Sequence, residues 1–231
     1  MQLDKKVSII IPARNEEKFL KKTIEFYRAE NYPLEIVVVV NNSDDRTFEI
    51  AKLYADKALN YLEKIGVSAA RNEGAKIAEG EIFIFSDADS YLEKGAIRRI
   101  VDQLDKNTIG SPLGRQNTKS FKGWLFFLFK NWTRRLKIHD GVIDGVLFCY
   151  RDIFFRIKGF DKNKKIAEFD DLINRGKLDG AKYKLFTNCY ATTSLRRYQE
   201  KGYLKSFIFW ISWKIVSIFK KEKKLTKEYF R

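Results

Sequence analysis

The sequence contains little of what metal-binding modules and disulfide scaffolds need. It has two cysteines, Cys149 and Cys189, far apart and without metal-ligand spacing, and a single histidine, His139. These counts argue against a zinc module, a disulfide framework and a histidine-rich metal site. The chain is 45% hydrophobic and 15% aromatic. That content is too apolar for a disordered protein, so a globular fold is expected.

Two glycine-rich signatures and a leader pattern are also missing from the sequence. Neither Gly-x-Gly-x-x-Gly nor a Walker loop occurs, which argues against a dinucleotide site and a P-loop. After Lys5 and Lys6 the chain enters an apolar strand pattern without the architecture of a signal peptide. We therefore expect a cytoplasmic location.

Positive charge is concentrated in two aromatic segments. The net charge is +15, of which residues 118–138 carry +6 without an acid and residues 195–231 carry +8. As a helix, residues 203–219 would span about 25 Å, which is short of an apolar bilayer core of about 30 Å, and Lys214 interrupts them. We expect amphipathic helices on an anionic membrane surface. Packing of these helices on the core is the alternative. No nucleic-acid partner is expected, since both segments are more apolar than a phosphate-tracking groove requires.

The first hundred residues alternate between strand and helix patterns. Apolar runs at 7–11, 36–40 and 81–85 are typical of strands buried on both faces, and 58–62 indicates a shorter one. Helical spacing separates them, and this alternation predicts an α/β fold with a mainly parallel sheet flanked by helices. The expected helices cover residues 16–29, 47–55, 67–79 and 92–104.

The second half is less regular. We expect helices at 119–138 and 168–178, strands at 142–150 and 183–186, and amphipathic helices from Leu195 onward.

Polar residues follow the three buried strands, at 12–16, 41–45 and 86–89. Ligands of open α/β sheets bind beyond the carboxyl ends of the strands. Asp87 and Asp89, one residue apart at a strand end, suit a hard cation such as Mg²⁺ or Mn²⁺. A turn with a helix cap at Asp89 or Ser90 is the structural alternative.

Four motifs occur in order along the first 110 residues, and two more follow. Together they resemble the family 2 glycosyltransferases of the GT-A fold, whose sheet is Rossmann-like. The motifs are residues 7–17 (VSIIIPARNEE), 38–47 (VVVNNSDDRT), 68–74 (SAARNEG), 82–89 (IFIFSDAD), the run from Tyr150 to Asp161, and 168–175 (EFDDLINR).

The resemblance implies a nucleoside diphosphate sugar donor, a divalent metal (Mg²⁺ or Mn²⁺) and inversion at the anomeric carbon. It implies Asp89 as the main metal ligand, with Asp87 contacting the metal or the donor, and Arg71 near the donor, pairing with Asp87 or a phosphate. The other residues that it places at the donor are Pro12, Ala13, Arg14, Asn15, Glu16, Asn41 and Asn42.

Two positions depart from the family pattern. Relatives carry Glu-Asp after the Gly-Phe-Asp motif, with the Asp as catalytic base, and here Phe169 falls at that Asp. Asp170 is the favoured base, Asp171 and Glu168 are alternatives, and all three could merely favour the dipole of the helix start. Val40 stands where relatives often have an acid that reads the nucleoside, so the donor base is not identified.

The domain expected from this resemblance covers residues 1–194, with a donor half at 1–110, an acceptor half at 111–194 and a basic helical appendage at 195–231. We expect sugar transfer to a lipid-linked or glycan acceptor at the inner face of the cell membrane, with Arg196 and Arg197 near an acceptor phosphate. A nucleotidyltransferase, or an inactive protein of this fold that binds sugar or nucleic acid, remains as an alternative. The first of these would typically carry a glycine-rich loop after its first strand, which residues 12–16 lack.

Overall fold

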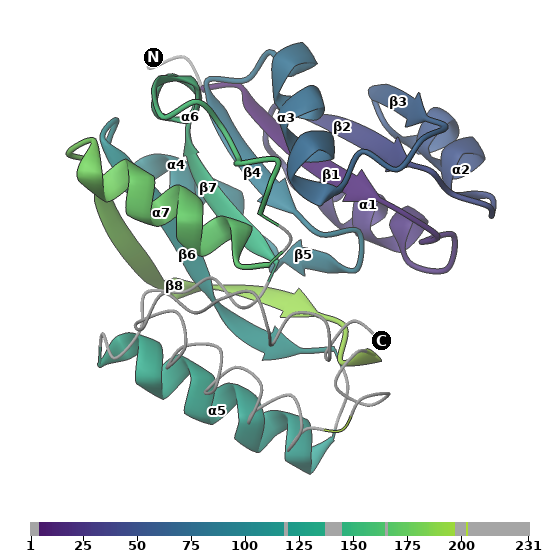
Figure 1. The fold of residues 1–231 in the computed structure, drawn as a ribbon. Coiled ribbons are helices and arrows are strands. Elements are labelled where there is room, and N and C mark those ends of the chain that lie inside the picture. The colour runs from purple at the N-terminus through teal and green to yellow at the C-terminus, as the bar shows by residue number, and fades with distance from the viewer. Residues whose placement is uncertain (1–4, 118–119, 137–144, 165, 197–201, 203–231) are drawn as a thin grey trace.

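A computed structural model describes residues 5–117, 120–136, 145–164, 166–196 and 202. Within them one mixed sheet of eight strands runs through the molecule in the order β3-β2-β1-β4-β7-β6-β8-β5 (Figure 1). The strands are β1 (Val7–Ala13), β2 (Leu34–Asn41), β3 (Lys57–Tyr61), β4 (Ile82–Ser86), β5 (Ser90–Leu92), β6 (Thr108–Gln116), β7 (Val146–Tyr150) and β8 (Lys182–Thr193).

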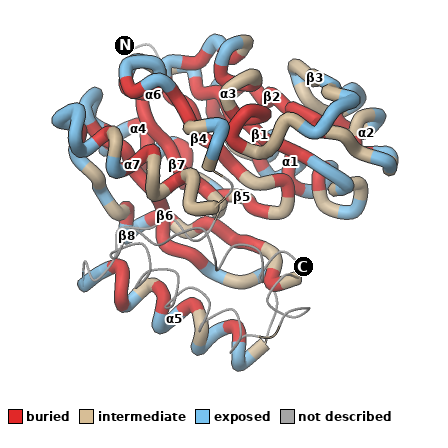
Figure 2. Tube along the Cα trace, in the orientation of Figure 1, coloured by how far each residue is buried: buried red, intermediate tan, exposed pale blue. Residues whose placement is uncertain are grey.

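Helices cover both faces of the sheet. Successive strand residues point to opposite faces, so the continuous apolar run of β1 places apolar side chains on both. Ile9 and Ile11 of β1 pack with α1, α2 and α4, whereas Ile10 between them packs on the side of α3, α6 and α7. All three are buried, as is most of the central sheet in Figure 2. The helices are α1 (Leu20–Arg28), α2 (Thr47–Tyr54), α3 (Val67–Ile77), α4 (Ala96–Gln103), α5 (Phe121–Arg135), α6 (Arg151–Arg156) and α7 (Glu168–Leu178).

The α/β architecture predicted from the sequence is confirmed. Strands β1 to β4 are mutually parallel, and the helices between them occur where the periodicity predicts them. Beyond β4 the sheet is mixed, since β7 is antiparallel to both β4 and β6. The amphipathic helices expected from Leu195 onward lie outside the described residues, apart from the first two positions and Gly202.

Strand β6 was not predicted from the sequence. Its run TIGSPLGRQ holds Gly110, Pro112 and Gly114, residue types that are depleted in strands. The fold requires glycine at one of these positions, because a side chain at Gly110 would collide with the Phe148 ring. The pairing of β6 with β8 also shifts register between Pro112 and Leu113. The short elements β5 and α6 were missed as well, because three and six residues carry too little periodicity.

No helix of the described residues combines the length and the apolar character needed to cross a bilayer.

A buried ion pair fixes the amino ends of the parallel strands. Glu35 of β2 accepts hydrogen bonds from Ser8 Oγ at 2.6 Å and the Glu79 amide at 2.8 Å, and its carboxylate lies 2.7 Å from Lys57 Nζ. Burial alone would raise the pKa of Glu35, but these hydrogen bonds, with Lys57 first among them, outweigh it and lower the pKa below its usual value. The charged form of Glu35 therefore stabilises the fold.

The variant Glu35→Gln should unfold more easily than wild type at neutral pH, by about 1–3 kcal/mol. A carboxyl with a depressed folded-state pKa stabilises the protein above its unfolded pKa, and this contribution disappears as the pH falls through the folded pKa. Acidification below about pH 4.5 should therefore narrow the gap between wild type and Glu35→Gln in urea unfolding. The exposed Glu63→Gln serves as the control. If the difference in free energy of unfolding between wild type and Glu35→Gln stays constant from neutral pH until Glu35 is fully protonated, this account is contradicted.

Candidate active site

The carboxyl ends of β1, β2 and β4 meet at one edge of the sheet, and hydrogen bonds join the loops that follow the first two. Asn15, in the left-handed region at φ 54°, donates its amide to Ser43 Oγ at 3.0 Å and accepts the Asp44 amide at 2.9 Å. Asn41 Oδ1 accepts the Ile65 amide at 2.9 Å, which ties the end of β2 to the approach of α3. The polar motifs after these two strands thus form one connected surface.

A buried arginine lies at the centre of this edge. Arg71 of α3 is only 1% exposed, and its guanidinium donates to Asp87 Oδ1 at 2.6 Å and to Glu168 Oε1 at 2.8 Å. Pairing with Asp87 is one of the two possibilities that the sequence left open. The second carboxylate, 97 positions away in the chain, was not predicted as its partner. One guanidinium therefore fixes β4 and α7 relative to α3.

Phe169 supports this guanidinium, which explains the departure from the family pattern in packing terms. The Arg71 guanidinium carbon lies 4.3 Å from the centroid of the Phe169 ring and 5.4 Å from that of Phe160. Phe169 is itself buried and contacts Phe160 edge-on at 5.7 Å. A cation over an aromatic face is stabilised by the ring quadrupole, most strongly where water is excluded.

The three candidate bases in the first turn of α7 lie in different environments. Glu168 binds Arg71, and Asp171 accepts from Arg175 Nε at 2.8 Å within the same helix. Arg175 also donates from Nη1 to the Ile157 carbonyl and from Nη2 to the Gly159 carbonyl. Asp171 is therefore part of a structural network. Asp170 lies between these two acids and is half-buried.

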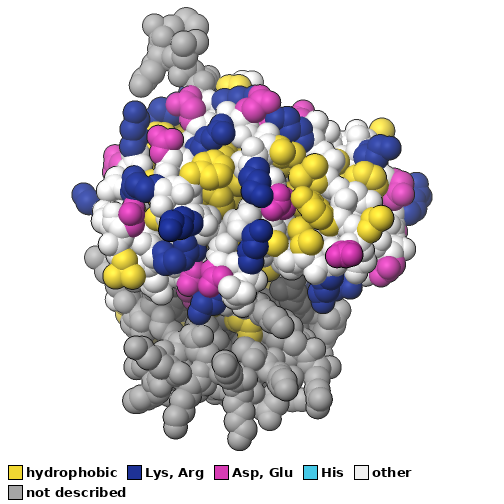
Figure 3. Space-filling view, turned by 45° about the horizontal axis from the view of Figure 1, so that its top comes forward, with side chains coloured by type: hydrophobic (Ala, Val, Ile, Leu, Met, Phe, Trp, Pro, Cys, Tyr) yellow, Lys and Arg dark blue, Asp and Glu magenta, His cyan; other side chains and the backbone are white. Residues whose placement is uncertain are grey.

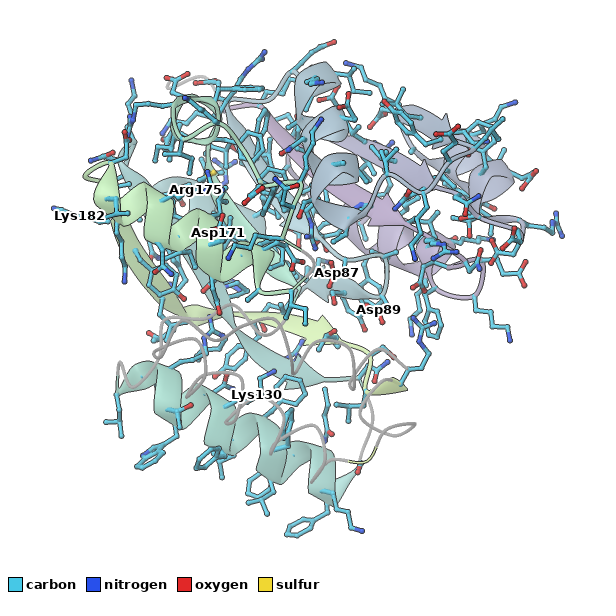
Figure 4. All side chains as sticks on the ribbon, in the orientation of Figure 1. Asp87, Asp89, Lys130, Asp171, Arg175 and Lys182 are labelled. Atoms are coloured by element: carbon cyan, nitrogen blue, oxygen red, sulfur yellow. The ribbon has the colours of Figure 1, made fainter. Side chains whose placement is uncertain are left out.

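Asp87 and Asp89 follow β4 directly and lie beside the start of β5 (Figure 4). The Asp87 amide donates to the Gly145 carbonyl at 2.9 Å. Gly145 has φ 68°, and a side chain there would approach Asp87 Oδ2 to 2.6 Å, so glycine is required next to this carboxylate. The Ser194 amide donates to the Asp89 carbonyl, which brings the end of β8 to the same place. Sequence reasoning missed Gly145, because its role depends on a contact between distant parts of the chain.

Arg196 lies on the acidic side of this edge. Its guanidinium Nη2 is 2.9 Å from Glu16 Oε1 and 3.8 Å from Asp89 Oδ2, and its carbon lies 4.7 Å from the centroid of the Phe19 ring. The sequence hypothesis put Arg196 near an acceptor phosphate; here it bridges two residues predicted for the donor and metal. Arg197 lies outside the described residues.

The side chains at this edge suit a divalent cation. Carboxylate oxygens are the ligands that Mg²⁺ and Mn²⁺ prefer, and Asp87 and Asp89 both supply them. Glu16 Oε2 is buried and has no hydrogen-bond partner among the described residues, while the neighbouring Arg196 brings a positive charge to its other oxygen. No group of three His, Cys, Asp or Glu side chains converges in the described part of the chain. Mg²⁺ sites at which substrate phosphates complete the shell usually have only one or two protein carboxylates.

The remaining residues predicted for the donor site differ in exposure. Pro12 and Ala13 are buried at the end of β1, so they can offer backbone rather than side chains. Arg14 is exposed, and its Nε donates to the Asn42 carbonyl at 3.1 Å. Asn42 has φ 56° and donates its side-chain amide to the Leu62 carbonyl. Val40 is wholly buried in the core.

Solved structures share this fold. A mannosyltransferase from Pyrobaculum calidifontis, solved with GDP-Man and Mn²⁺, superposes with a TM-score of 0.68 over 83% of this chain and 57% of its own, at 19% identity. The Staphylococcus aureus protein TarS, solved with UDP-GlcNAc, gives 0.63 over 81% and 58%, also at 19% identity. The layered sheet with acids at its carboxyl edge is therefore the GT-A fold.

The sequence profile of glycosyl transferase family 2 matches residues 8–167, and this chain belongs to that family. A dolichol-phosphate mannosyltransferase from Pyrococcus furiosus is 33% identical over 167 residues, which are 67% of this chain and 45% of that protein. The glycosyltransferase GlyA of Streptococcus pneumoniae is 29% identical over 62% of this chain and 21% of its own length. The chain thus spans less than half the length of these relatives.

Replacing Arg71 by Met should lower the free energy of unfolding by about 3–5 kcal/mol, because Asp87 and Glu168 would lose their shared cation in a largely buried setting. Arg71→Lys should recover part of the loss, since one ammonium cannot match both carboxylates with a rigid planar fork. Urea unfolding measures both values. The control is Arg156→Met, which breaks the solvent-exposed pair with Asp179 and should cost at most about 1 kcal/mol. Equal losses for Arg71→Met and Arg156→Met would contradict a structural role of the buried cluster.

Proposed function

We propose that this chain transfers a sugar from a nucleoside diphosphate sugar to an acceptor, with inversion at the anomeric carbon. The observation that carries the proposal is the Arg71 bridge between Asp87 and Glu168. It fixes the acids that follow β4 and the acids that begin α7 around a common centre. Inverting transfer needs this arrangement, with charge stabilisation at the leaving group and a base at the attacking hydroxyl.

We assign the donor to the half formed by residues 1–110. The joined loops after β1 and β2 offer the backbone of Pro12 and Ala13 together with Arg14, Asn15 and Asn42 for the nucleoside. Because Val40 is buried in the core, its side chain is unavailable to read the base. The nucleotide sugars in the two structural neighbours support this class of donor.

Asp89, with Asp87 beside it, would hold Mg²⁺ or Mn²⁺. When bound, such a cation neutralises charge that develops on the leaving diphosphate. Arg196 can contribute to phosphate binding in two ways, since its guanidinium lies next to Glu16 and Asp89. It either turns toward the donor phosphates or, together with Arg197, toward a phosphate of the acceptor.

Asp170 is the proposed base. It lies half-buried in the first turn of α7, and the ion pair of its neighbour Glu168 with Arg71 fixes that turn beside Asp87. Asp170, on the same turn, would take the proton from the acceptor hydroxyl as the bond to the anomeric carbon forms.

The acceptor half is residues 111–194, and the proposed acceptor is a lipid-linked saccharide or polyprenyl phosphate, with a soluble glycan as the alternative. The similarity to a dolichol-phosphate mannosyltransferase supports a lipid-linked class. The proposed location is the inner face of the cell membrane. The concentration of charge in residues 118–138 and 195–231 supports that placement.

Removing the carboxylate of Asp89 should abolish metal-dependent donor binding. A ligand at about 100 times its Kd stabilises a protein by about 2.7 kcal/mol. Wild type should therefore gain thermal stability with a nucleoside diphosphate plus Mn²⁺, and Asp89→Asn should gain none. Thermal-shift measurements over UDP and GDP, each with and without Mn²⁺, provide the test. Asp102→Asn, an exposed acid on α4, is the matched control. Full metal-dependent stabilisation of Asp89→Asn would refute the assignment.

Asp170→Asn should still bind donor and metal but lose turnover by at least about 100-fold, which is the usual contribution of a positioned base. Asp171→Asn should retain most of its turnover. Both variants need the thermal-shift response of wild type and a kcat measured with the same acceptor. A larger loss for Asp171→Asn than for Asp170→Asn would move the base to Asp171.

A further inference from the structure

Helix α5 has the reverse of the usual amphipathic arrangement. Its outward stripe consists of large apolar side chains that are 43–72% exposed, namely Phe121, Trp124, Leu125, Leu128, Phe129, Trp132 and Leu136. Its inward side is largely polar, and its buried residues are Gly123, Phe127, Lys130, Thr133 and Arg134. A surface helix normally presents its polar side to water. An apolar stripe of this kind therefore indicates an interaction surface.

Specific contacts fix the orientation of α5. The Asn131 side chain makes a two-way amide pair with the backbone of Gly114 in β6, at 2.7 and 3.0 Å. Arg134 Nη2 donates to Ser111 Oγ at 2.5 Å and to the Tyr183 hydroxyl at 3.3 Å. These bonds hold the polar side of α5 against β6 and β8, so the apolar stripe must point away from the sheet.

Two further residues make this orientation difficult to reverse. Gly123 faces the sheet, where a side chain would come within 2.5 Å of Leu195. The Lys130 ammonium lies 4.6 Å from the centroid of the Phe127 ring and 5.2 Å from that of Phe126. Rotating α5 by half a turn would expose these groups and break the hydrogen bonds of Asn131 and Arg134 with β6 and β8. Figure 1 shows α5 along one side of the molecule, beyond β6 and β8.

We propose that the apolar stripe of α5 docks on an anionic lipid bilayer, with the helix lying in the plane of the interface. A helix of 15 residues is about 22 Å long, short of an apolar core of about 30 Å, so it cannot cross. Trp124 and Trp132 suit the headgroup boundary, where an apolar ring with one polar atom is favoured. Exposed Lys122 and Arg135 near the two ends supply charge for anionic headgroups, and residues 118–138 contain no acid.

Charge is distributed differently elsewhere on the surface. On the face shown in Figure 3, Lys and Arg side chains are interspersed with Asp and Glu. The segment containing α5 is basic throughout its charged positions, which favours an anionic partner for its apolar stripe over a second copy of this cationic chain. The inference rests on the proposed membrane location and deepens it, since it assigns the contact to one side of α5. Docking of α5 requires neither donor nor turnover, so it can fail while sugar transfer is retained.

Tryptophan emission can report docking of α5 itself. The chain has four tryptophans, and Trp210→Phe with Trp213→Phe leaves only Trp124 and Trp132. We expect this variant to float with vesicles of phosphatidylcholine and phosphatidylglycerol, with blue-shifted emission that brominated phosphatidylcholine quenches. Neutral vesicles of phosphatidylcholine alone should bind more weakly. Failure to bind the anionic vesicles, or binding without any change in emission, would overturn the proposal.

A matched pair of variants separates α5 from general hydrophobicity. Phe121→Gln, Leu125→Gln and Leu128→Gln combined in the same background should weaken vesicle partitioning at least about tenfold, since each removes a large apolar side chain from the stripe. The control is Leu53→Gln, Leu62→Gln and Leu178→Gln, which removes three leucines of 73–90% exposure on other parts of the surface and should leave partitioning unchanged. Equal partitioning of the two triple variants would overturn the proposal. Light scattering of a wild-type dimer that only the α5 variant dissociates would instead identify the stripe as an interface between copies.

Discussion

The arrangement of the candidate site depends on one buried cation. Arg71 has almost no contact with solvent, and a guanidinium in that position is tolerated only when its charge is compensated. Its two terminal nitrogens are hydrogen-bonded, whereas Nε has no hydrogen-bond partner among the described residues. Asp87 and Glu168 supply the charge, and the Phe169 ring covers one face. Since the three contacts come from β4 and α7 while the arginine is on α3, none of these elements can shift without exposing an unpaired charge.

This constraint positions the acids to which the chemistry is assigned. Asp87, Glu168 and Asp171 are held by arginines and position the surrounding backbone. Asp89 and Asp170 are their neighbours in sequence. The proposed metal ligands are Asp89 and Asp87, and the proposed base is Asp170. Phe169, which looked like the loss of a catalytic acid in the sequence, contributes to the anchoring.

Local pattern was enough to predict the first half of the fold. The continuous apolar runs of β1, β2 and β4 need burial on both faces, and only a covered sheet provides it. Strand β6 could not be found in this way, since its Gly110 is explained by the Phe148 ring that packs against it from β7. The same limit applies to the site. Strand-end acids were visible in the sequence, but the pairing of Arg71 with Glu168 joins residues 97 positions apart and has no local signal.

Helix α5 shows a related limit. The sequence indicated a basic, aromatic helix but left open whether its apolar residues pack on the core. The answer depends on Asn131 and Arg134, whose partners Gly114, Ser111 and Tyr183 lie on other elements. A few polar contacts thus determine the orientation of α5, whereas its sequence alone predicts only that it is helical and basic.

The most direct test of the account is a crystal structure with Mn²⁺ and a nucleoside diphosphate, in which anomalous scattering locates the metal. The account predicts a metal peak within coordination distance of an Asp89 oxygen, with Arg71 still bridging Asp87 and Glu168. A metal bound away from Asp89, or an Arg71 guanidinium released from both carboxylates, would contradict it.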